Sequence, residues 1–388
     1  MSMRRKTAIV GIGATPYYRR GRSAPRTLNE LVGTAILAAV ADAGLHIEDV
    51  DGFAYYGGGF DTPYLCEMLG IPEVRFTAGL TGSGGGSAGA IGLASAAVIA
   101  GLAETVVCVG GMQQTAQRYG TITSAYAPDP ENAFFLPAGL VGPGHMFALL
   151  ARRHMHLYGT TRDHFAEVAI SNRINALTHP DATIRKPLAR EDYFAAPLLA
   201  DPHCLFDFCL ENDGAIAAIV TSAERARDLR RKPVSILAST HGGEREWGRS
   251  LYWMNMSDDL FASSGHRSVA RRLYADAGLG PQDIDCAQIY DHFTSQVIMQ
   301  LEDYGFCEIG EGGPFVASGA IRREGGSLPI NTDGGQLSCG YIWGMTHIRE
   351  AVEQIRGTAA NQIDGVETAL VTGGPSNVPV SGLILAAA

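Results

Sequence analysis

The 388-residue chain lacks the features that mark several large classes of protein. No apolar run approaches the roughly 20 residues that a helix needs to span a bilayer. No Lys/Arg run of the kind that a nucleic-acid binder requires is present, and the net charge of −10 argues against such a binder. The seven cysteines are scattered without a CxxC pair, and the histidines have no convincing metal-ligand spacing. We therefore expect a cytoplasmic protein with reduced thiols, no membrane span and no metal site.

The chain contains a repeat. The letters ADAGL occur at 41–45 and again at 275–279, and DVD at 49–51 matches DID at 283–285. Tyr56 and Tyr290 stand at the same distance beyond these motifs. Later in each half, ETVVCVGG at 104–111 matches ETALVTGG at 367–374. A duplication of this kind predicts two similar halves.

In each half, the sequence predicts a strand, a helix, a strand, a glycine-rich turn, a helix and a strand, in that order. This alternation is typical of α/β sheets with helices on both faces. We divide the chain into 1–225, with loop insertions at about 112–205, and 226–388. Long irregular segments are expected at 112–145 and 241–267, and a strand pair at 206–221. Helices are expected at 28–43, 88–100, 147–158, 164–175, 268–277 and 345–355, where apolar residues recur at helical spacing.

The two glycine-rich turns are the candidate site. The first is AGLTGSGGGSAG at 78–89, and the second is NTDGGQLSCGYIWG at 331–344. Glycine lets a backbone approach a ligand closely and leaves N–H groups available to an oxyanion. Tyr341 lies just before a helix N-terminus, which favours negative charge. Its phenol is therefore either an acid/base group or a packing aromatic bonded to a carbonyl.

Seven blocks in a fixed order resemble the thiolase superfamily, in its sterol-carrier-type and lipid-transfer-protein branch. The resemblance covers nearly the whole chain and implies the thiolase fold: two βαβ-type halves in five layers related by a pseudo-twofold. It further implies a homodimer that acts on acyl-CoA thioesters. The blocks are AIVGIGATPY, the glycine-rich turn with its helix at 82–100, residues 154–182, NDGAIAAIVTSAERA, IYDHF at 289–293, NTDGGQLSCGYIWG and VTGGPSN.

The departures from the thiolase pattern define the predicted chemistry. Around Gly82 and Ser83 the nucleophilic cysteine of thiolases is missing, and Tyr341 replaces their histidine. The region of Thr372 lacks their second cysteine, and Tyr290 stands where the branch often has histidine. Two tyrosines at these places resemble the retro-aldolases of the superfamily, which cleave β-hydroxyacyl-CoA esters from steroid side chains. The resemblance implies that Tyr290 and Tyr341 are the acid and base.

Retro-aldol cleavage needs no covalent intermediate, but the enolate of the thioester must be stabilised. We expect no cofactor besides the coenzyme A of the substrate. His292 and Cys339 are possible supporting residues. Backbone N–H groups of the glycine turns are expected to bind the thioester, at Gly82, Ser83, Gly84, Gly373 and Gly374.

Two alternatives stay open at this point. The chain is an acyltransferase if Ser83, Ser87 or Cys339 acts as an unconventional nucleophile. It is a non-catalytic acyl-CoA or lipid-binding subunit if a partner does the chemistry.

The resemblance also implies a small OB-fold partner with a zinc ribbon.

Overall fold

The computed structural model describes residues 3–57, 59–80, 84–114, 135–244, 261–374 and 379–388. Ten strands form one sheet in the order β10-β11-β12-β9-β1-β8-β5-β3-β4, with the short β2 (Tyr18–Arg19) beside β8. The sheet has two parts, which meet only where β1 pairs with β9 through Ala8–Ser235 and Ile9–Val234. Each part corresponds to one of the repeats read in the sequence.

The first part carries the elements of the first repeat. They are β1 (Thr7–Ala14), α1 (Leu28–Ala43), β3 (Gly52–Tyr56), α2 (Thr62–Leu69), β4 (Phe76–Leu80), α3 (Ser87–Ile99), β5 (Thr105–Met112) and β8 (Asn212–Ser222). Helix α1 begins at a capping box, in which Thr27 and Glu30 bind each other's backbone N–H, and ends at the left-handed Gly44. These boundaries agree with the predicted helix at 28–43.

The second part repeats this order. It contains β9 (Val234–Gly242), α9 (Arg267–Ala277), β10 (Cys286–Gln288), α10 (Thr294–Asp303), α11 (Gly312–Ala317), α12 (Gly335–Ser338), α13 (Met345–Arg356), β11 (Thr368–Gly373) and β12 (Val380–Ala387). Strand β4 pairs in parallel with β3, and Ile330 pairs in parallel with Ala287 of β10 in the same way. The two predicted turns therefore leave equivalent positions of the two sheets, one toward α3 and the other toward α13.

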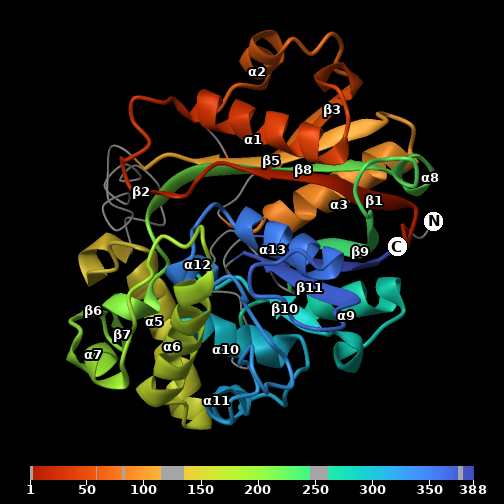
Figure 1. Cartoon of the computed structure of the whole chain (residues 1–388). Helices are drawn as coiled ribbons and strands as arrows, with labels where there is room; N and C mark the ends of the chain where they lie inside the picture. The colour runs from red at the N-terminus through yellow and green to blue at the C-terminus, as the bar shows by residue number, and fades with distance from the viewer. Residues whose placement is uncertain (1–2, 58, 81–83, 115–134, 245–260, 375–378) are drawn as a thin grey trace.

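Hydrophobic burial arranges the chain in five layers (Figure 1). Helices α3 and α13 lie between the two parts of the sheet, where Ile91 and Ile348 share a core with strand residues of both. Helix α1 covers the outer face of the first part, and α9 and α10 cover that of the second. The predicted thiolase-type architecture is confirmed.

An insertion between β5 and β8 packs beside the second part. It contains α5 (Pro143–Tyr158), α6 (Arg162–Thr178), α7 (Arg190–Ala195), β6 (Leu198–Ala200) and β7 (His203–Cys204). Helix α6 contacts α10, α11 and α12 and so supports the second turn from below (Figure 1). Much of the predicted irregular segments, 115–134 and 245–260, lies outside the described residues.

The prediction of a strand pair at 206–221 is wrong. Only one strand forms there, β8, and residues 205–207 form a 3₁₀ turn. The cause is the buried carboxylate of Asp207, which accepts hydrogen bonds from Cys204 N and the Tyr193 hydroxyl and bends the chain.

Within the described residues, no helix is both long enough and apolar enough to cross a bilayer.

Candidate active site

Tyr290 and Tyr341 meet at their hydroxyl groups. Tyr290 lies two residues beyond β10, and Tyr341 lies in the turn between α12 and α13. The two oxygens are 3.1 Å apart, and the side chains are only 1% and 2% exposed. The rings meet edge to face, with centroids 6.3 Å apart. One phenol therefore donates a hydrogen bond to the other in a space from which bulk water is excluded.

A closed set of hydrogen bonds holds the backbone of Tyr290. Its N–H donates to the Thr372 hydroxyl oxygen at 2.8 Å, and that hydroxyl donates to Gln300 Oε1 at 2.6 Å. The Gln300 amide donates back to the Tyr290 carbonyl at 2.8 Å. Thr372, near the end of β11, thus holds the backbone of Tyr290 and through it positions the phenol. Nothing in the sequence pointed to this role except the absence of a cysteine at that place.

Asp291, next to Tyr290, points into a different environment. Its carboxylate accepts hydrogen bonds from the backbone N–H groups of Gln336 and Leu337 and from the Asn172 amide. These donors stabilise the negative charge and hold it on the side toward α12. The carboxylate next to Tyr290 is therefore held by donors on α6 and α12.

The turn that carries Tyr341 is fixed from both sides. Tyr341 N–H donates to Asn212 Oδ1 at the start of β8, at 3.2 Å. Trp343, in the left-handed conformation with φ of 53°, packs its ring 5.6 Å from that of Tyr341. Gly344 follows with φ of 82°, and a Cβ on it would lie 3.0 Å from Tyr290 Cε2. Glycine is required at 344 because both its backbone conformation and the neighbouring phenol exclude a side chain.

His292 is buried beside the tyrosine pair. Its Nδ1 lies 3.4 Å from the Tyr290 carbonyl oxygen, and its ring packs against Phe147 with centroids 4.7 Å apart. Its Nε2 has no hydrogen-bond partner among the described residues. Burial lowers the pKa of His292 to about 3, so the imidazole is neutral. His292 therefore brings no positive charge to the phenols and offers only a hydrogen-bonding group.

Cys339 is a packing residue. Its buried thiol lies 3.9 Å from His179 Nδ1 and packs with Ala176 and Ala182. Burial raises the pKa of the Cys339 thiol well above its usual value. The thiol therefore stays protonated and is a poor nucleophile.

The predicted glycine segments of the two halves touch through their backbones. A Cβ on Gly374 would lie 2.4 Å from Gly85 Cα, and one on Gly373 would lie 3.6 Å from Gly85 O. The hydroxyl of Tyr56 accepts a hydrogen bond from Gly84 N–H and fixes the first segment. Backbone groups from both halves are thus gathered at one place. Gly82 and Ser83, predicted for the same role, lie outside the described residues.

His266 supports the last glycine. Its Nε2 lies 3.1 Å from the Gly374 carbonyl, and its Nδ1 lies 3.1 Å from the Tyr304 hydroxyl. Burial lowers the pKa of His266 to about 4, so the ring is neutral. Because a carbonyl only accepts, Nε2–H donates to Gly374 and Nδ1 accepts from Tyr304.

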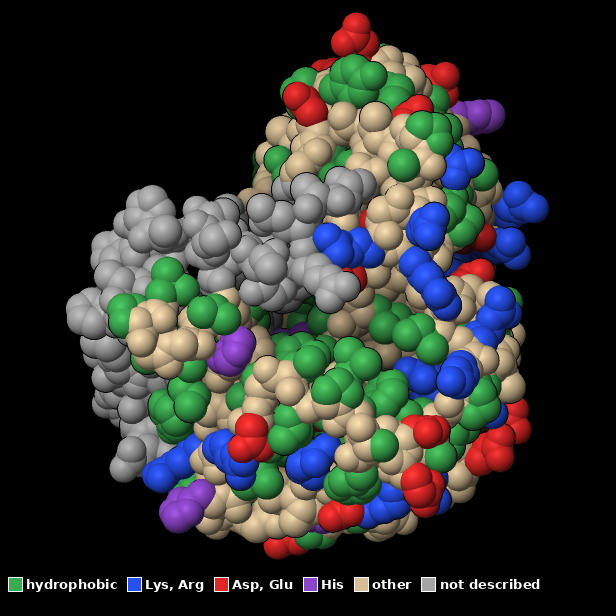
Figure 2. Space-filling view, turned by 90° about the vertical axis from the view of Figure 1, so that its left-hand side faces the viewer, with side chains coloured by type: hydrophobic (Ala, Val, Ile, Leu, Met, Phe, Trp, Pro, Cys, Tyr) green, Lys and Arg blue, Asp and Glu red, His purple; other side chains and the backbone are tan. Residues whose placement is uncertain are grey.

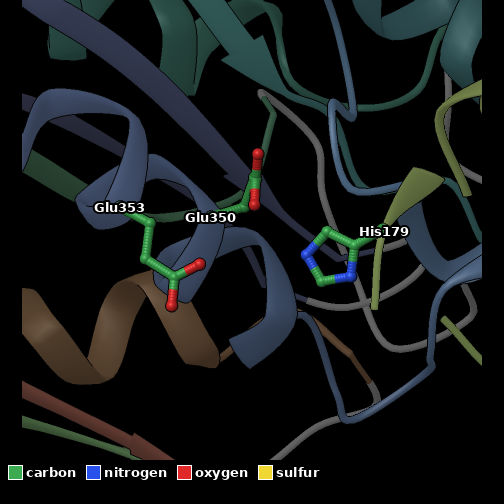
Figure 3. Close-up of side chains that lie close together, drawn as sticks. All are labelled: His179, Glu350 and Glu353. Carbon is green, nitrogen blue, oxygen red and sulfur yellow. The ribbon is translucent and has the colours of Figure 1, made fainter. Parts of the chain in front are cut away.

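Three side chains with metal-ligand chemistry come close together: Glu350 and Glu353 on α13, and His179 at the end of α6. His179, Glu350 and Glu353 offer ligand atoms within 4.8 Å of one another (Figure 3). Glu350 accepts a hydrogen bond from the Thr332 hydroxyl, and Glu353 pairs with Arg349 at 2.8 Å. Burial raises the pKa of Glu350 to about 8, so its carboxyl holds a proton at neutral pH. Because both acids already have protein partners, we assign no metal to the group, and the absence of a metal stays a prediction.

One face of the molecule is hollowed. This face, on the left of Figure 1 where β2 and α5 lie, shows hydrophobic side chains around a central depression (Figure 2). Inside the fold, an aromatic and methionine cluster adjoins His292 and extends toward α5. Its members are Met146, Phe147, Leu150, Phe293 and Met299, with Phe135, Phe208 and Phe261 packed against them. The region next to the tyrosine pair is thus strongly apolar.

The comparisons with known proteins agree with this geometry. Residues 248–378 match the family described as "Thiolase C-terminal domain-like". The chain is 40% identical to the 17-hydroxy-3-oxo-4-pregnene-20-carboxyl-CoA lyase of Mycobacterium tuberculosis, with 98% of this chain and 99% of that protein covered. It is 39% identical to a steroid side-chain-cleaving aldolase of Thermomonospora curvata, with 98% and 97% covered.

A solved structure matches as well. The "Ltp2-ChsH2(DUF35) aldolase" superposes with a TM-score of 0.91 at 38% identity and covers 99% of this chain and 98% of that chain. The resemblance that the sequence motifs carried is confirmed. The chain belongs to the thiolase superfamily and, within it, to the branch that contains the steroid side-chain-cleaving aldolases.

Proposed function

We propose that this chain is an acyl-CoA aldolase that cleaves the Cα–Cβ bond of a β-hydroxyacyl-CoA, with Tyr290 and Tyr341 as its acid and base. The observation that carries the proposal is the 3.1 Å contact between two buried phenol oxygens from separate segments. Relatives that share the full length of the chain are named as a CoA lyase and an aldolase.

The reaction proceeds in two proton transfers around one bond cleavage. One tyrosine, acting as base in its phenolate form, takes the proton of the β-hydroxyl, and the Cα–Cβ bond breaks to give a ketone or aldehyde. The electron pair of that bond passes to Cα and forms the enolate of the thioester. The second phenol then protonates Cα and releases the shortened acyl-CoA. The hydrogen bond between the phenols lets one proton pass from one tyrosine to the other and restores the starting state.

The backbone and the aromatic cluster have separate parts in this scheme. N–H groups of the glycine segments bind the thioester, as predicted at Gly82, Ser83, Gly373 and Gly374, whereas the Gly84 N–H already donates to the Tyr56 hydroxyl. The apolar cluster next to His292 suits a bulky acyl group such as a steroid side-chain ester, and the neutral His292 offers a hydrogen-bonding group to it. Coenzyme A enters only as part of the substrate.

The acyltransferase alternative needs a reactive thiolate or alkoxide. Burial raises the pKa of the thiol in Cys339, and no described base contacts Ser87. The geometry therefore favours the lyase, for which no nucleophile is needed.

The test supplies the substrate named for the mycobacterial relative to the purified chain, alone and with a DUF35-type partner. We expect a 17-oxo steroid and propionyl-CoA in equal amounts, measured by mass spectrometry. An acyl group trapped on Cys339 or a serine would instead establish an acyltransferase. Tight binding of the acyl-CoA without turnover, even with the partner present, would establish a binding subunit.

Assembly is part of the proposal. Strand β4 ends the first part of the sheet with half-buried and exposed residues alternating along it, so its free edge suits pairing with a second copy in a homodimer. The solved relative is an aldolase together with a DUF35 protein, and we propose a small partner of this type here.

We also propose 1–225 and 226–388 as the duplicated units, since β8 completes the first part of the sheet and β9 opens the second. Seven free thiols suit a cytoplasmic location.

A further inference from the structure

Ser87 carries a buried hydroxyl that the fold does not use. It is the first residue of α3, directly after the segment at Gly84–Gly86, and it is 1% exposed. Its Oγ has no hydrogen-bond partner among the described residues. A buried hydroxyl without a partner costs about 1–3 kcal/mol in mutational data, so a serine that serves packing alone would be better replaced by alanine.

The hydroxyl lies close to the ring of Tyr290. A Cβ on Gly344 would lie 2.9 Å from Ser87 Oγ and 3.0 Å from Tyr290 Cε2. One methyl group would thus touch both, and Gly344 keeps the space between them free. Ser87 and Tyr290 come from different halves of the chain, and only the pseudo-symmetric packing of α3 against the second turn brings them together.

The hydroxyl also stands at a helix start. The first N–H groups of an α-helix have no acceptor within the helix, and they point along its axis with the positive end of the helix dipole. Helix α3 has 13 residues and no acidic residue in its first turn. The N–H groups of this first turn and the unpartnered O–H therefore lie where a negatively charged oxygen would be stabilised.

We propose that Ser87 is a catalytic residue whose hydroxyl donates a hydrogen bond to the thioester oxygen, together with the first N–H groups of α3. The inference rests on the proposed aldolase function. As the Cα–Cβ bond breaks, negative charge moves from Cα onto this oxygen, and the hydrogen bond strengthens as the charge develops. Protonation of Cα removes this charge and restores the neutral thioester carbonyl. Ser87 itself neither gains nor loses a proton.

The test variant is Ser87→Ala. The probe is propionyl-CoA in D₂O with the complete protein and its partner, because exchange of the α-hydrogens forms the same enolate without carbon–carbon cleavage. Removing one donor of an oxyanion site typically costs about 10²–10³ in rate. We expect S87A to slow exchange and turnover of the hydroxyacyl-CoA by about 10²-fold, with KM nearly unchanged and thermal stability kept.

Ser95→Ala is the matched control, because Ser95 is buried on the same helix but bonds Thr7 Oγ1 at 2.6 Å. We expect S95A to lose stability and keep its activity, the reverse of S87A. If S87A exchanges and cleaves at the unaltered rate, the role of Ser87 is refuted and the aldolase stands. If the unaltered protein neither exchanges propionyl-CoA nor cleaves the steroid ester, the aldolase assignment itself is refuted, and this inference with it.

Discussion

The two halves of the chain place a tyrosine at the same position and use it differently. Tyr56 is the last residue of β3, and Tyr290 lies two residues beyond β10, at matching distances from the repeated motifs. The Tyr56 hydroxyl accepts a hydrogen bond from Gly84 N–H, and its ring fills the space beside Gly86. The Tyr290 hydroxyl instead meets another phenol, that of Tyr341. One tyrosine holds a turn, and the other contacts the second phenol of the pair that we propose as acid and base.

The difference arises in the turns. The first turn consists largely of glycine, so the phenol of its own half reaches in and binds the backbone. The second turn carries a tyrosine of its own, and Trp343 from this turn packs against both Tyr341 and Tyr56. The two turns lie at equivalent positions, but their residues differ, and this difference is why we place the proposed chemistry in the second half.

The largest effects are expected from removing the hydroxyls of the second half. Tyr290→Phe and Tyr341→Phe should each lower kcat at least a hundredfold, because general acid–base catalysis contributes about 10²–10⁴. Steady-state cleavage of the hydroxyacyl-CoA measures this, and circular dichroism checks that the fold is intact. Full activity in both variants would remove the tyrosines from the mechanism.

A methyl group at the second turn should have the next largest effect. Gly344→Ala places a Cβ against Tyr290 and Ser87. We expect kcat to fall by about tenfold or more, in addition to a loss of about 1–2 kcal/mol of unfolding free energy from the left-handed backbone. Gly357→Ala is the control at the other end of α13. It has a similar φ of 75° and nothing within 4 Å of the added Cβ, so it should lose stability alone. Equal activity losses in both variants would show that the strain matters and the contact does not.

The first-half tyrosine should give a smaller effect of a different kind. Tyr56→Phe removes the acceptor of Gly84 N–H and should cost about 1–3 kcal/mol of unfolding free energy, because that buried donor loses its partner. Turnover should fall far less than in Tyr290→Phe. Denaturant unfolding and kcat, measured on the same preparations, separate the two. A hundredfold loss of kcat in Y56F with unchanged stability would erase the distinction between the halves.

The two central helices also differ between the halves. Helix α3 carries no charged residue, whereas α13 carries the buried Glu350. The folded chain keeps the Glu350 proton up to about pH 8, whereas the unfolded chain loses it near 4.5. The folded state therefore binds more protons in this range, and stability falls as the pH rises through it. Glu350→Gln should remove this loss, so its Tm relative to the unaltered protein should rise by a few degrees from pH 5 to pH 9. A constant difference in Tm would show that Glu350 is already ionised in the fold.

The architecture and the tyrosine pair could be predicted from the sequence, and the reason is physical. Repeated motifs place equivalent turns together, and the motif resemblance marked Tyr290 and Tyr341 as the residues that replace thiolase side chains. The residues that hold the pair could not be predicted, because their hydrogen bonds join segments far apart along the chain. They are Thr372, Gln300 and Asn212. The strand pair at 206–221 was wrong because one buried carboxylate, that of Asp207, outweighed an apolar pattern.

The most direct test of the account is the cleavage rate of the double variant Tyr290→Phe/Tyr341→Phe beside the two single variants. If the phenols act as one unit, the double variant loses about the same factor in kcat as the more damaged single variant, as in other catalytic groups that work together. If the two losses multiply, the tyrosines act independently, and the central claim of a coupled pair is contradicted.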